Sequence, residues 1–238
     1  MSSSCPPLPS PRPFSLRAAM GRLRKVVTSW QAPIVTEVSE DMDDLPPRTR
    51  RRDKPFRVLI SCVLSLRTKD ETTRAATRRL FALAATPEAI LKLSQKRLAR
   101  LIYPVGFYNT KARQIRAICR QIIERFGGQV PCEIDALLTL PGVGRKTANL
   151  VLTRGHGLPG ICVDVHVHRI SNRWGYIQTK SPNESEMALR AKLPRAYWIE
   201  YNDLLVAFGQ NCCKPVSPHC SVCPLKDLCP RIGVERWR

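Results

Sequence analysis

The sequence is short of acidic residues. Its 238 residues include 19 Asp and Glu against 39 Lys and Arg, which leaves a formal net charge of +20. A surplus of this size is typical of proteins that act on a polyanion. Nucleic acid is the leading candidate, and an anionic membrane surface is the alternative. The sequence also lacks any run approaching the roughly 20 apolar residues that cross a bilayer, so we expect a soluble protein with no membrane partner.

An apolar signal segment is also missing, although the chain has ten cysteines. In a secreted protein ten cysteines would suggest a disulfide framework. Here four of them crowd into the C-terminal tail, which favours a metal or cluster site in a reducing compartment. We therefore expect an intracellular protein.

The N-terminal residues 1–16 are rich in Ser and Pro, which prevents a regular element. We expect a disordered basic tail there. The absence of acidic residues before Glu37 is weakly similar to a mitochondrial presequence. Mitochondrial or nuclear targeting by this tail is the minor alternative.

Signals for β-hairpins are missing along the whole chain. Helix starts and stops recur instead, from a nearly continuous apolar stretch at 56–66 to a segment at 111–126 that ends at two glycines. After the first of these, Thr68 and Glu71 have the spacing of a capping box and predict where the next helix begins. About five helices precede residue 134, so the predicted fold class is all-α.

One segment resists this assignment. Residues 163–168 read Val-Asp-Val-His-Val-His, a strict alternation that by periodicity alone predicts a short strand. A lone strand among helices has nothing to pair with, so we interpret the segment as the beginning of a helix with Asp164 as N-cap. Asp164 is then either only a cap or also a functional carboxylate.

Residues 140–150 are the most informative stretch, with the sequence Leu-Pro-Gly-Val-Gly-Arg-Lys-Thr-Ala-Asn-Leu. Proline and two closely spaced glycines predict a tight reversal, and a good helix start follows. With the short apolar helix expected at 134–139, the unit is a helix-hairpin-helix. The free amides of its second helix can bind one phosphate without reading base sequence. Lys146, in the first turn, is either a phosphate contact or, when deprotonated, a nucleophile.

The C-terminal cysteines have the spacing C-x6-C-x2-C-x5-C, formed by Cys213, Cys220, Cys223 and Cys229. Four thiolates this close can enclose one tetrahedral ion or one cubane cluster, and either would hold together a tail too short for its own core. The spacing matches neither zinc ribbons nor bacterial ferredoxins, so it predicts a metal without deciding between zinc and iron-sulfur. Cys212 is a spare that could compete as first ligand.

The helix-hairpin-helix, the Val163–His166 segment and the cysteine spacing occur in one order and together resemble the endonuclease III family of DNA glycosylases. The match runs roughly from Leu23 to Arg231. The resemblance implies a [4Fe-4S] cluster in place of zinc. It also implies a six-helix barrel over residues 48–158, with the helix-hairpin-helix at about 134–153. An iron-sulfur cluster domain would be formed by residues 159–238 together with an early helix and linker at 17–47.

The resemblance further implies a bifunctional DNA glycosylase and abasic-site (AP) lyase of base excision repair. Such an enzyme removes oxidised bases, pyrimidines foremost, by forming a lysine Schiff base and nicking the strand by β-elimination. Lys146 would be the nucleophile and Asp164 the assisting carboxylate. The partner would be double-stranded DNA with damaged bases or abasic sites, bound by a monomeric, DNA-associated protein. The residues expected at DNA are Gly142, Val143, Gly144, Arg145, Thr147, Arg67, Phe107, Lys111 and His166.

Two positions depart from the family's pattern. Arg67 stands where relatives carry a Gln that fills the gap left by a flipped base, and Phe107 stands where a Leu wedge is common. Both changes bear on which lesion is preferred. Two alternatives stay open: a monofunctional adenine or mismatch glycosylase that activates water, and a non-catalytic DNA-binding module with a structural metal. Lys146 argues against the first, because such relatives usually lack lysine there.

Overall fold

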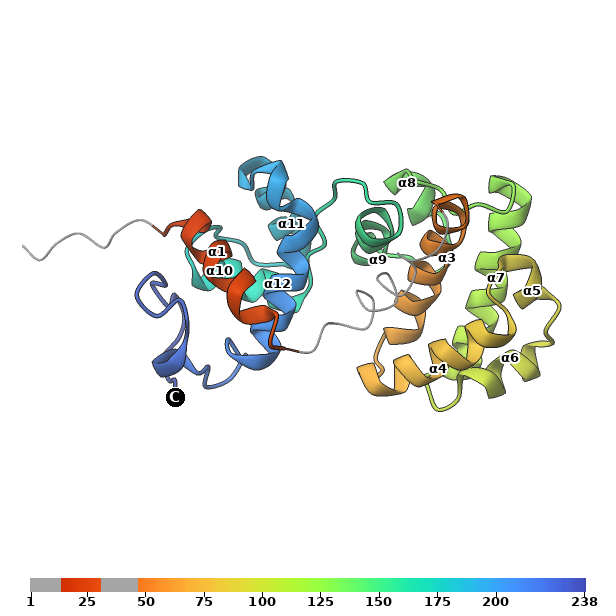
Figure 1. The fold of residues 1–238 in the computed structure, drawn as a ribbon, viewed down its shortest axis with the longest axis horizontal. Helices are drawn as coiled ribbons and strands as arrows, with labels where there is room; N and C mark the ends of the chain where they lie inside the picture. Colours follow the sequence, from red (N-terminus) through yellow and green to blue (C-terminus); the bar gives the residue numbers. More distant parts are fainter. Residues whose placement is uncertain (1–13, 31–46) are drawn as a thin grey trace, which may run out of the picture.

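The computed structural model describes residues 14–30 and 47–238. Within these ranges every regular element is a helix and no strand forms (Figure 1). The all-α fold class expected from the sequence is therefore confirmed. None of the described helices is long and apolar enough to span a membrane.

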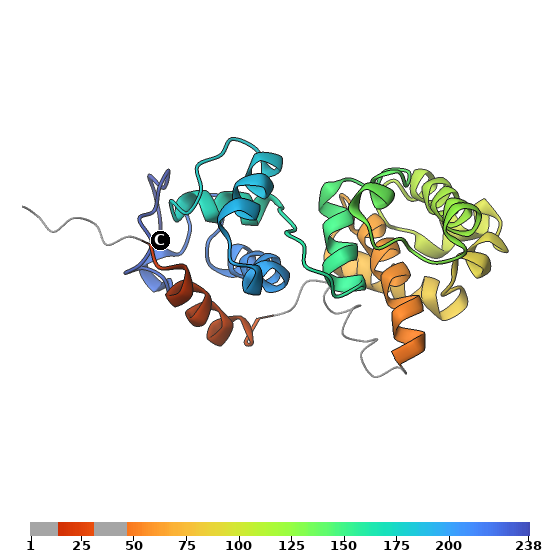
Figure 2. The ribbon, with the colours of Figure 1, turned by 90° about the horizontal axis from the view of Figure 1, so that it is seen from above.

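The helices form two halves, each around its own hydrophobic core (Figures 1 and 2). The first, which we call the barrel half (residues 47–155), is one continuous stretch of chain whose core residues run from Phe56 to Leu152. Its elements are α3 (Pro47–Ser65), α4 (Asp70–Leu83), α5 (Pro87–Leu91), α6 (Gln95–Ile102), α7 (Tyr108–Phe126), α8 (Ile134–Leu138), α9 (Arg145–Leu150) and the π-helix η1 (Val151–Gly155).

The second, which we call the cysteine half (residues 14–30 and 161–238), is formed by two segments that are far apart in the sequence. Helix α1 packs beside α12, where Arg24 makes a bidentate contact with Glu200, and Arg22 makes a second bidentate contact with Asp227 in the C-terminal segment. Its elements are α1 (Leu16–Val27), α10 (Val165–Arg173), α11 (Pro182–Lys192), η2 (Arg195–Tyr197), α12 (Trp198–Asn211) and η3 (Cys220–Val222).

Helix α7 illustrates how the sequence pattern produces the barrel half. Ile115, Ile118 and Ile122 recur at helical spacing and are fully buried, while Arg113 and Arg120 on the other side are exposed. The helix ends at Gly127, whose φ of 59° is accessible to glycine at little cost, and the backbone N–H groups of Gly127 and Gly128 both donate to Ile122. The apolar face of α7 therefore packs against α5 and α6, and the glycine C-cap determines where the helix ends.

Two expectations are corrected by tertiary contacts. Thr68 does not cap the next helix: α4 begins at Asp70 with Lys69 as N-cap and no side-chain cap bond. The expected tail over residues 1–16 is too long by three residues, because Phe14 stacks on Trp174 at a centroid distance of 4.8 Å and Ser15 caps α1. Residues 1–13, where the rest of the tail was expected, lie outside the described part of the chain.

Candidate active site and DNA interface

A side chain of α7 hydrogen-bonds to the turn between α8 and α9. Gln114 donates through Nε2 to the carbonyl of Pro141 at 2.9 Å. A Cβ atom on Gly142 would lie 2.3 Å from that Nε2, and the φ of Gly142 is 67°. The positive φ therefore favours glycine at position 142, and a Cβ there would also displace the amide end of Gln114. The hairpin predicted from the sequence is present, and Gln114 of α7 links it to the rest of the barrel half.

Lys146 and Asp164 face each other, although they come from different halves. The Nζ of Lys146 lies 3.6 Å from Oδ2 of Asp164. The other carboxylate oxygen, Oδ1, accepts from the backbone N–H groups of His166 and Val167 at 2.9 Å each, which makes Asp164 the N-cap of α10. The helix start predicted over the alternating segment is thus confirmed. One carboxylate caps its helix with one oxygen and presents the other to the lysine.

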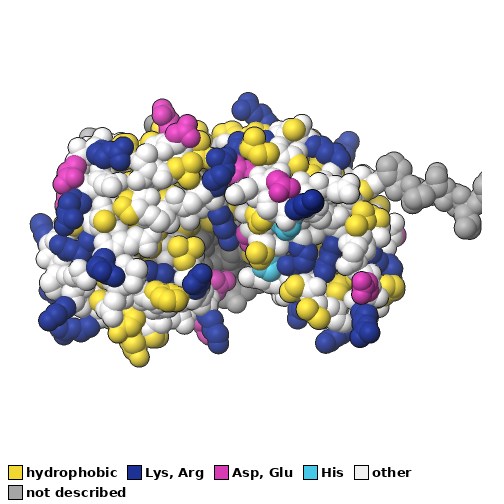
Figure 3. Space-filling model, turned by 180° about the vertical axis from the view of Figure 1, so that it is seen from behind, with side chains coloured by type: hydrophobic (Ala, Val, Ile, Leu, Met, Phe, Trp, Pro, Cys, Tyr) yellow, Lys and Arg dark blue, Asp and Glu magenta, His cyan; other side chains and the backbone are white. Residues whose placement is uncertain are grey.

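The two side chains line a cleft of about 260 Å³ between the halves. Asp164 is only 7% exposed, whereas the side chain of Lys146 is 51% exposed, so the amine can be reached from the cleft. Ser65 from the barrel half and His166 and Asn202 from the cysteine half also line it. On the face seen in Figure 3 the surface is hollowed between the halves, and dark blue Lys and Arg side chains outnumber the acidic ones.

Two buried thiols lie near the lysine. Burial raises the pKa of Cys62 to about 12 and raises that of Cys162 still more, while the nearby charge of Lys146 lowers both less strongly. The Sγ of Cys162 contacts the carbonyl of Lys146 at 3.7 Å. Both thiols are therefore protonated near neutral pH, which argues against a thiolate nucleophile at this site.

Arg67 and Phe107 are brought together at the surface from two different loops. The Arg67 guanidinium lies 5.7 Å from the centroid of the Phe107 ring, a cation–π distance. Both residues have positive φ, 52° and 57°, which is uncommon for non-glycine residues and is often seen at functional sites. Phe107 is 63% exposed, so a large apolar ring is displayed to solvent.

Lys111 lies under the surface beside the loops that carry Arg67 and Phe107. It is 4% exposed, and its Nζ donates to the carbonyls of Leu64 and Leu66 and to the Oγ1 of Thr68. The same Oγ1 accepts from the backbone N–H of Gly106 at 3.1 Å. The structure thus gives Lys111 a role inside the protein: it ties the loop of Arg67 to the loop of Phe107.

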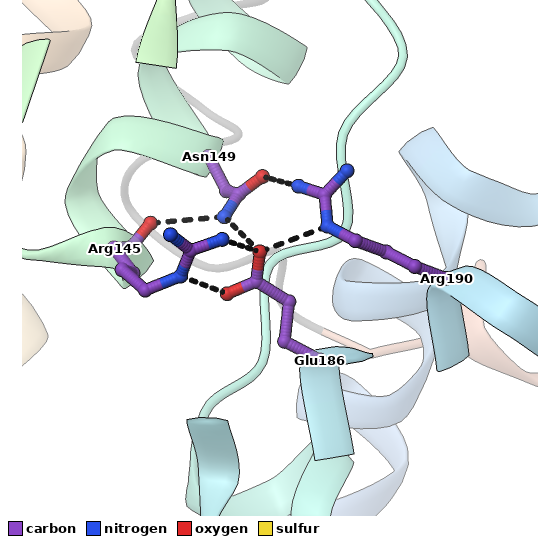
Figure 4. Close-up of polar contacts among 4 residues, drawn as sticks. All are labelled: Arg145, Asn149, Glu186 and Arg190. Carbon is purple, nitrogen blue, oxygen red and sulfur yellow. Dashed lines mark hydrogen bonds and ion pairs between the residues drawn. The ribbon is translucent and has the colours of Figure 1, made fainter. Parts of the chain in front are cut away.

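Other residues expected at DNA also make internal contacts. Val143 is 6% exposed and Thr147 5%, which leaves mainly their backbone to a ligand. Arg145 makes a bidentate contact with Glu186 of α11 (Figure 4). Sequence analysis missed Glu186. The only indication in the sequence was that Glu186 precedes Leu189 by three residues and therefore shares the buried face of α11 with it.

His166 lies at the cleft and is linked to the cysteine tail. Its Nδ1 is 3.1 Å from Nη2 of Arg169, which also donates to the carbonyl of Cys213 at 2.8 Å. Burial lowers the pKa of His166, the charge of Asp164 acts in the opposite direction, and the charges of Arg169 and Lys146 add to the lowering. The imidazole is therefore neutral near pH 7 and can hydrogen-bond without adding charge to the cleft.

The four predicted ligands, together with Cys212, line one cavity in the cysteine half. Among the described residues no three His, Cys, Asp or Glu side chains converge closely enough for a single metal ion. The donor set is all sulfur, and Arg173 donates to the Sγ of Cys213 at 3.4 Å. An all-sulfur donor set in one cavity has the chemistry that an iron-sulfur cluster requires.

Comparisons with known protein families agree with this site. Residues 60–195 match the HhH-GPD superfamily of base excision DNA repair proteins, and residues 213–229 match the iron-sulfur binding domain of endonuclease III. The second match begins at Cys213, which favours that residue over Cys212 as first ligand. The fold and site therefore define a helix-hairpin-helix base excision repair protein with a [4Fe-4S] cluster.

Individual relatives narrow the family further. The chain is 45% identical over 196 residues to endonuclease III of Thermotoga maritima, covering 82% of this chain and 92% of that one. The structure matches a non-covalent endonuclease III–DNA complex with a TM-score of 0.76 and 33% identity, over 91% and 94% of the two chains. It matches a trapped covalent endonuclease III–DNA intermediate with a TM-score of 0.70 and 33% identity, over 88% and 96%. The chain belongs to the endonuclease III family, as the sequence resemblance indicated.

Proposed function

We propose that this base excision repair protein is a bifunctional DNA glycosylase and AP lyase, with Lys146 as nucleophile. The observation that carries the proposal is the 3.6 Å approach of the Lys146 amine to the Asp164 carboxylate in the cleft between the halves. The trapped covalent endonuclease III–DNA intermediate of a structural relative supports covalent chemistry. We further propose that the enzyme acts as a monomer on duplex DNA carrying a damaged base or an abasic site.

The first chemical step joins the lysine to the sugar. The target nucleotide leaves the base stack, at a cost of a few kcal/mol that is lower for a poorly paired base. The deprotonated amine of Lys146 then attacks the anomeric carbon C1′ while the glycosidic bond breaks and its electron pair leaves with the base. Asp164 stabilises the positive charge that develops on the sugar and accepts the proton released from the amine.

The second step cleaves the strand. Opening of the sugar ring converts the C1′–nitrogen bond into an imine, which acidifies the hydrogen on C2′. Loss of that proton forms the C1′–C2′ enamine, and expulsion of the 3′ phosphate across C2′–C3′ completes β-elimination. Water then hydrolyses the imine and frees Lys146. An amine nucleophile leads to this step, whereas an activated water would stop after base release.

The helix-hairpin-helix binds and orients the DNA, and the cysteine segment supports the fold. The first amides of α9 and the Gly142–Gly144 turn can hold a backbone phosphate next to Lys146. Cys213, Cys220, Cys223 and Cys229 would hold the [4Fe-4S] cluster, which would cross-link this segment of the chain. Arg173 also donates to the carbonyls of Lys214 and Pro215 and keeps that segment in place.

Oxidised pyrimidines are the proposed substrates, and Arg67 with Phe107 is the proposed pair that enters the duplex at the flipped nucleotide. The exposed ring of Phe107 can stack against bases, and the guanidinium held over it can hydrogen-bond to the unpaired base opposite the lesion. The pair therefore adds a donor and a positive charge at the place where relatives insert other residues.

Borohydride reduction tests the nucleophile. With a duplex that contains one thymine glycol, we expect wild type to form a covalent adduct and to nick the strand without added base or heat. Lys146→Gln should lose trapping by a factor on the order of 10³ or more and still bind the duplex. Lys96→Gln, which changes an exposed lysine on α6, is the matched control and should trap like wild type. Equal trapping by Lys146→Gln would refute the assignment.

Asp164→Asn separates catalysis from helix capping, because Asn caps a helix about as well as Asp. We expect excision to fall by roughly 10²- to 10³-fold, since the charge that stabilises the transition state is lost. Base release without strand cleavage by wild type would instead indicate a monofunctional glycosylase. Unchanged excision in Asp164→Asn would refute the catalytic role of Asp164. Absence of base release from every lesion tested would count for the non-catalytic alternative.

A further inference from the structure

The two reacting groups belong to different halves of the molecule. Lys146 is on α9 of the barrel half, and Asp164 begins α10 of the cysteine half. Their 3.6 Å separation therefore depends on how the halves are held together. A peptide linker with no regular element, residues 157–163, connects η1 to the N-cap of α10. A linker of this kind does not by itself set a distance of a few ångströms, so side-chain contacts across the cleft must contribute.

Glu186 is the centre of such a contact (Figure 4). It lies on α11, and its side chain is only 4% exposed. Its carboxylate accepts from Nε and Nη2 of Arg145 at 3.0 and 2.7 Å, from Nδ2 of Asn149 at 3.2 Å and from Nε of Arg190 at 3.0 Å. Arg190 also donates to Oδ1 of Asn149 at 3.1 Å, which closes the network.

The network includes the two α9 residues that bracket the nucleophile. Arg145 immediately precedes Lys146, and Asn149 follows it by three residues, so both are fixed to one buried carboxylate on the opposite half. Burial alone would raise the pKa of Glu186, but the hydrogen bonds from Arg145, Arg190 and Asn149 outweigh it and lower the pKa. The carboxylate is therefore charged at neutral pH, and its hydrogen bonds are of the strong, charge-assisted kind.

We propose that Glu186 is a positioning residue that fixes α9 against α11, so that the amine of Lys146 faces the carboxylate of Asp164. The inference rests on the proposed function, because it concerns the geometry of that reaction. Glu186 itself does not line the cleft, so it acts through Arg145 and Asn149. A second ion pair, between Arg154 and Asp203, also joins the halves. Loss of the Glu186 charge should therefore loosen the interface without separating it.

Glu186→Gln is the decisive variant, and Glu200→Gln is its matched control. Glu200 also accepts two bonds from one arginine, Arg24, but that pair lies within the cysteine half. Three quantities are compared with wild type: the single-turnover rate of base excision from a thymine glycol duplex, the rate of nicking at a preformed abasic site, and the affinity for DNA. Excision needs both Lys146 and the charge of Asp164, whereas attack on the aldehyde of an abasic site depends less on Asp164.

We expect Glu186→Gln to slow excision roughly tenfold or more, since a 1 Å misplacement can cost about 10²-fold. Abasic-site nicking and DNA affinity should stay within about threefold of wild type. Glu200→Gln should match wild type in all three. A global loss of folded protein would lower excision and nicking by the same factor, which is a different pattern from the one expected here.

Arg145→Lys gives a second, milder test if Glu186→Gln folds poorly. It keeps the positive charge but replaces two parallel bonds with one, so we expect a smaller loss confined to excision. Wild-type excision in both variants, or equal losses in excision and nicking, would overturn the inference. Absence of both reactions in the wild-type protein would instead refute the proposed function.

Discussion

Replacement of Lys111 by Met would test the most unexpected charge in the barrel half. The ammonium group of Lys111 is buried and donates to two carbonyls and a hydroxyl, and burial lowers its pKa from 10.5 to about 8. The folded protein therefore releases this proton more readily than the unfolded chain does. A Met side chain has a similar length and cannot titrate, so the stability of the variant lacks the pH dependence that Lys111 contributes.

The sign and size of the pH effect follow from that difference. Between pH 8 and 10.5 the unfolded chain keeps its proton on Lys111 while the folded protein loses it, so the free energy of unfolding rises with pH. The gap between the two pKa values corresponds to about 3 kcal/mol across the whole window. For a chain of this size, 1 kcal/mol shifts the melting temperature by about 2–4 °C, so the full effect is roughly 6–12 °C.

Thermal unfolding at a series of pH values provides the assay. The melting temperature of wild type minus that of Lys111→Met should increase as the pH rises from 7 towards 10. Lys96→Met removes an exposed lysine on α6 and should show no such trend. A difference that stays constant or shrinks with pH would refute the argument that Lys111 is held at a desolvated site. At any pH, Lys111→Met should also weaken DNA binding, because Lys111 ties together the loops of Arg67 and Phe107.

Three further outcomes are expected. Arg173→Met removes the donor to the Sγ of Cys213, so the visible absorbance of the cluster should bleach faster in air than in wild type. Gly142→Ala places a methyl group against Gln114 at a φ of 67°, so we expect a loss of roughly 1–3 kcal/mol in stability and weaker binding of abasic DNA, measured by melting and titration. If about 4–6 phosphates are neutralised, the log–log dependence of DNA affinity on salt should have a slope of about −4 to −5, and a flat response would argue against DNA as the partner.

Local features of the molecule were predictable because neighbouring residues determine them. The Gly142 turn depends on a backbone conformation that few residues other than glycine adopt. The start of α10 depends on the Asp164 carboxylate, which accepts from the amides of His166 and Val167, and this outweighs the alternating pattern of residues 163–168. The cysteine spacing likewise predicted a metal, although the choice of an iron-sulfur cluster came from the resemblance to the endonuclease III family.

The directions of the long charged side chains were decided only by the tertiary structure. In the sequence, Arg145 and Lys111 both belong to a surplus of positive charge expected to face phosphate. In the fold, Arg145 donates to the buried carboxylate of Glu186, 41 positions away. Lys111 donates to backbone carbonyls 47 and 45 positions away. A sequence pattern reports the polarity of a residue and its local periodicity, but the acceptor that a flexible cation finds depends on which distant segments pack beside it. The sequence therefore determined the hairpin, the helix start at Asp164 and the four-cysteine motif, while packing of the two halves decided that Lys146 meets Asp164.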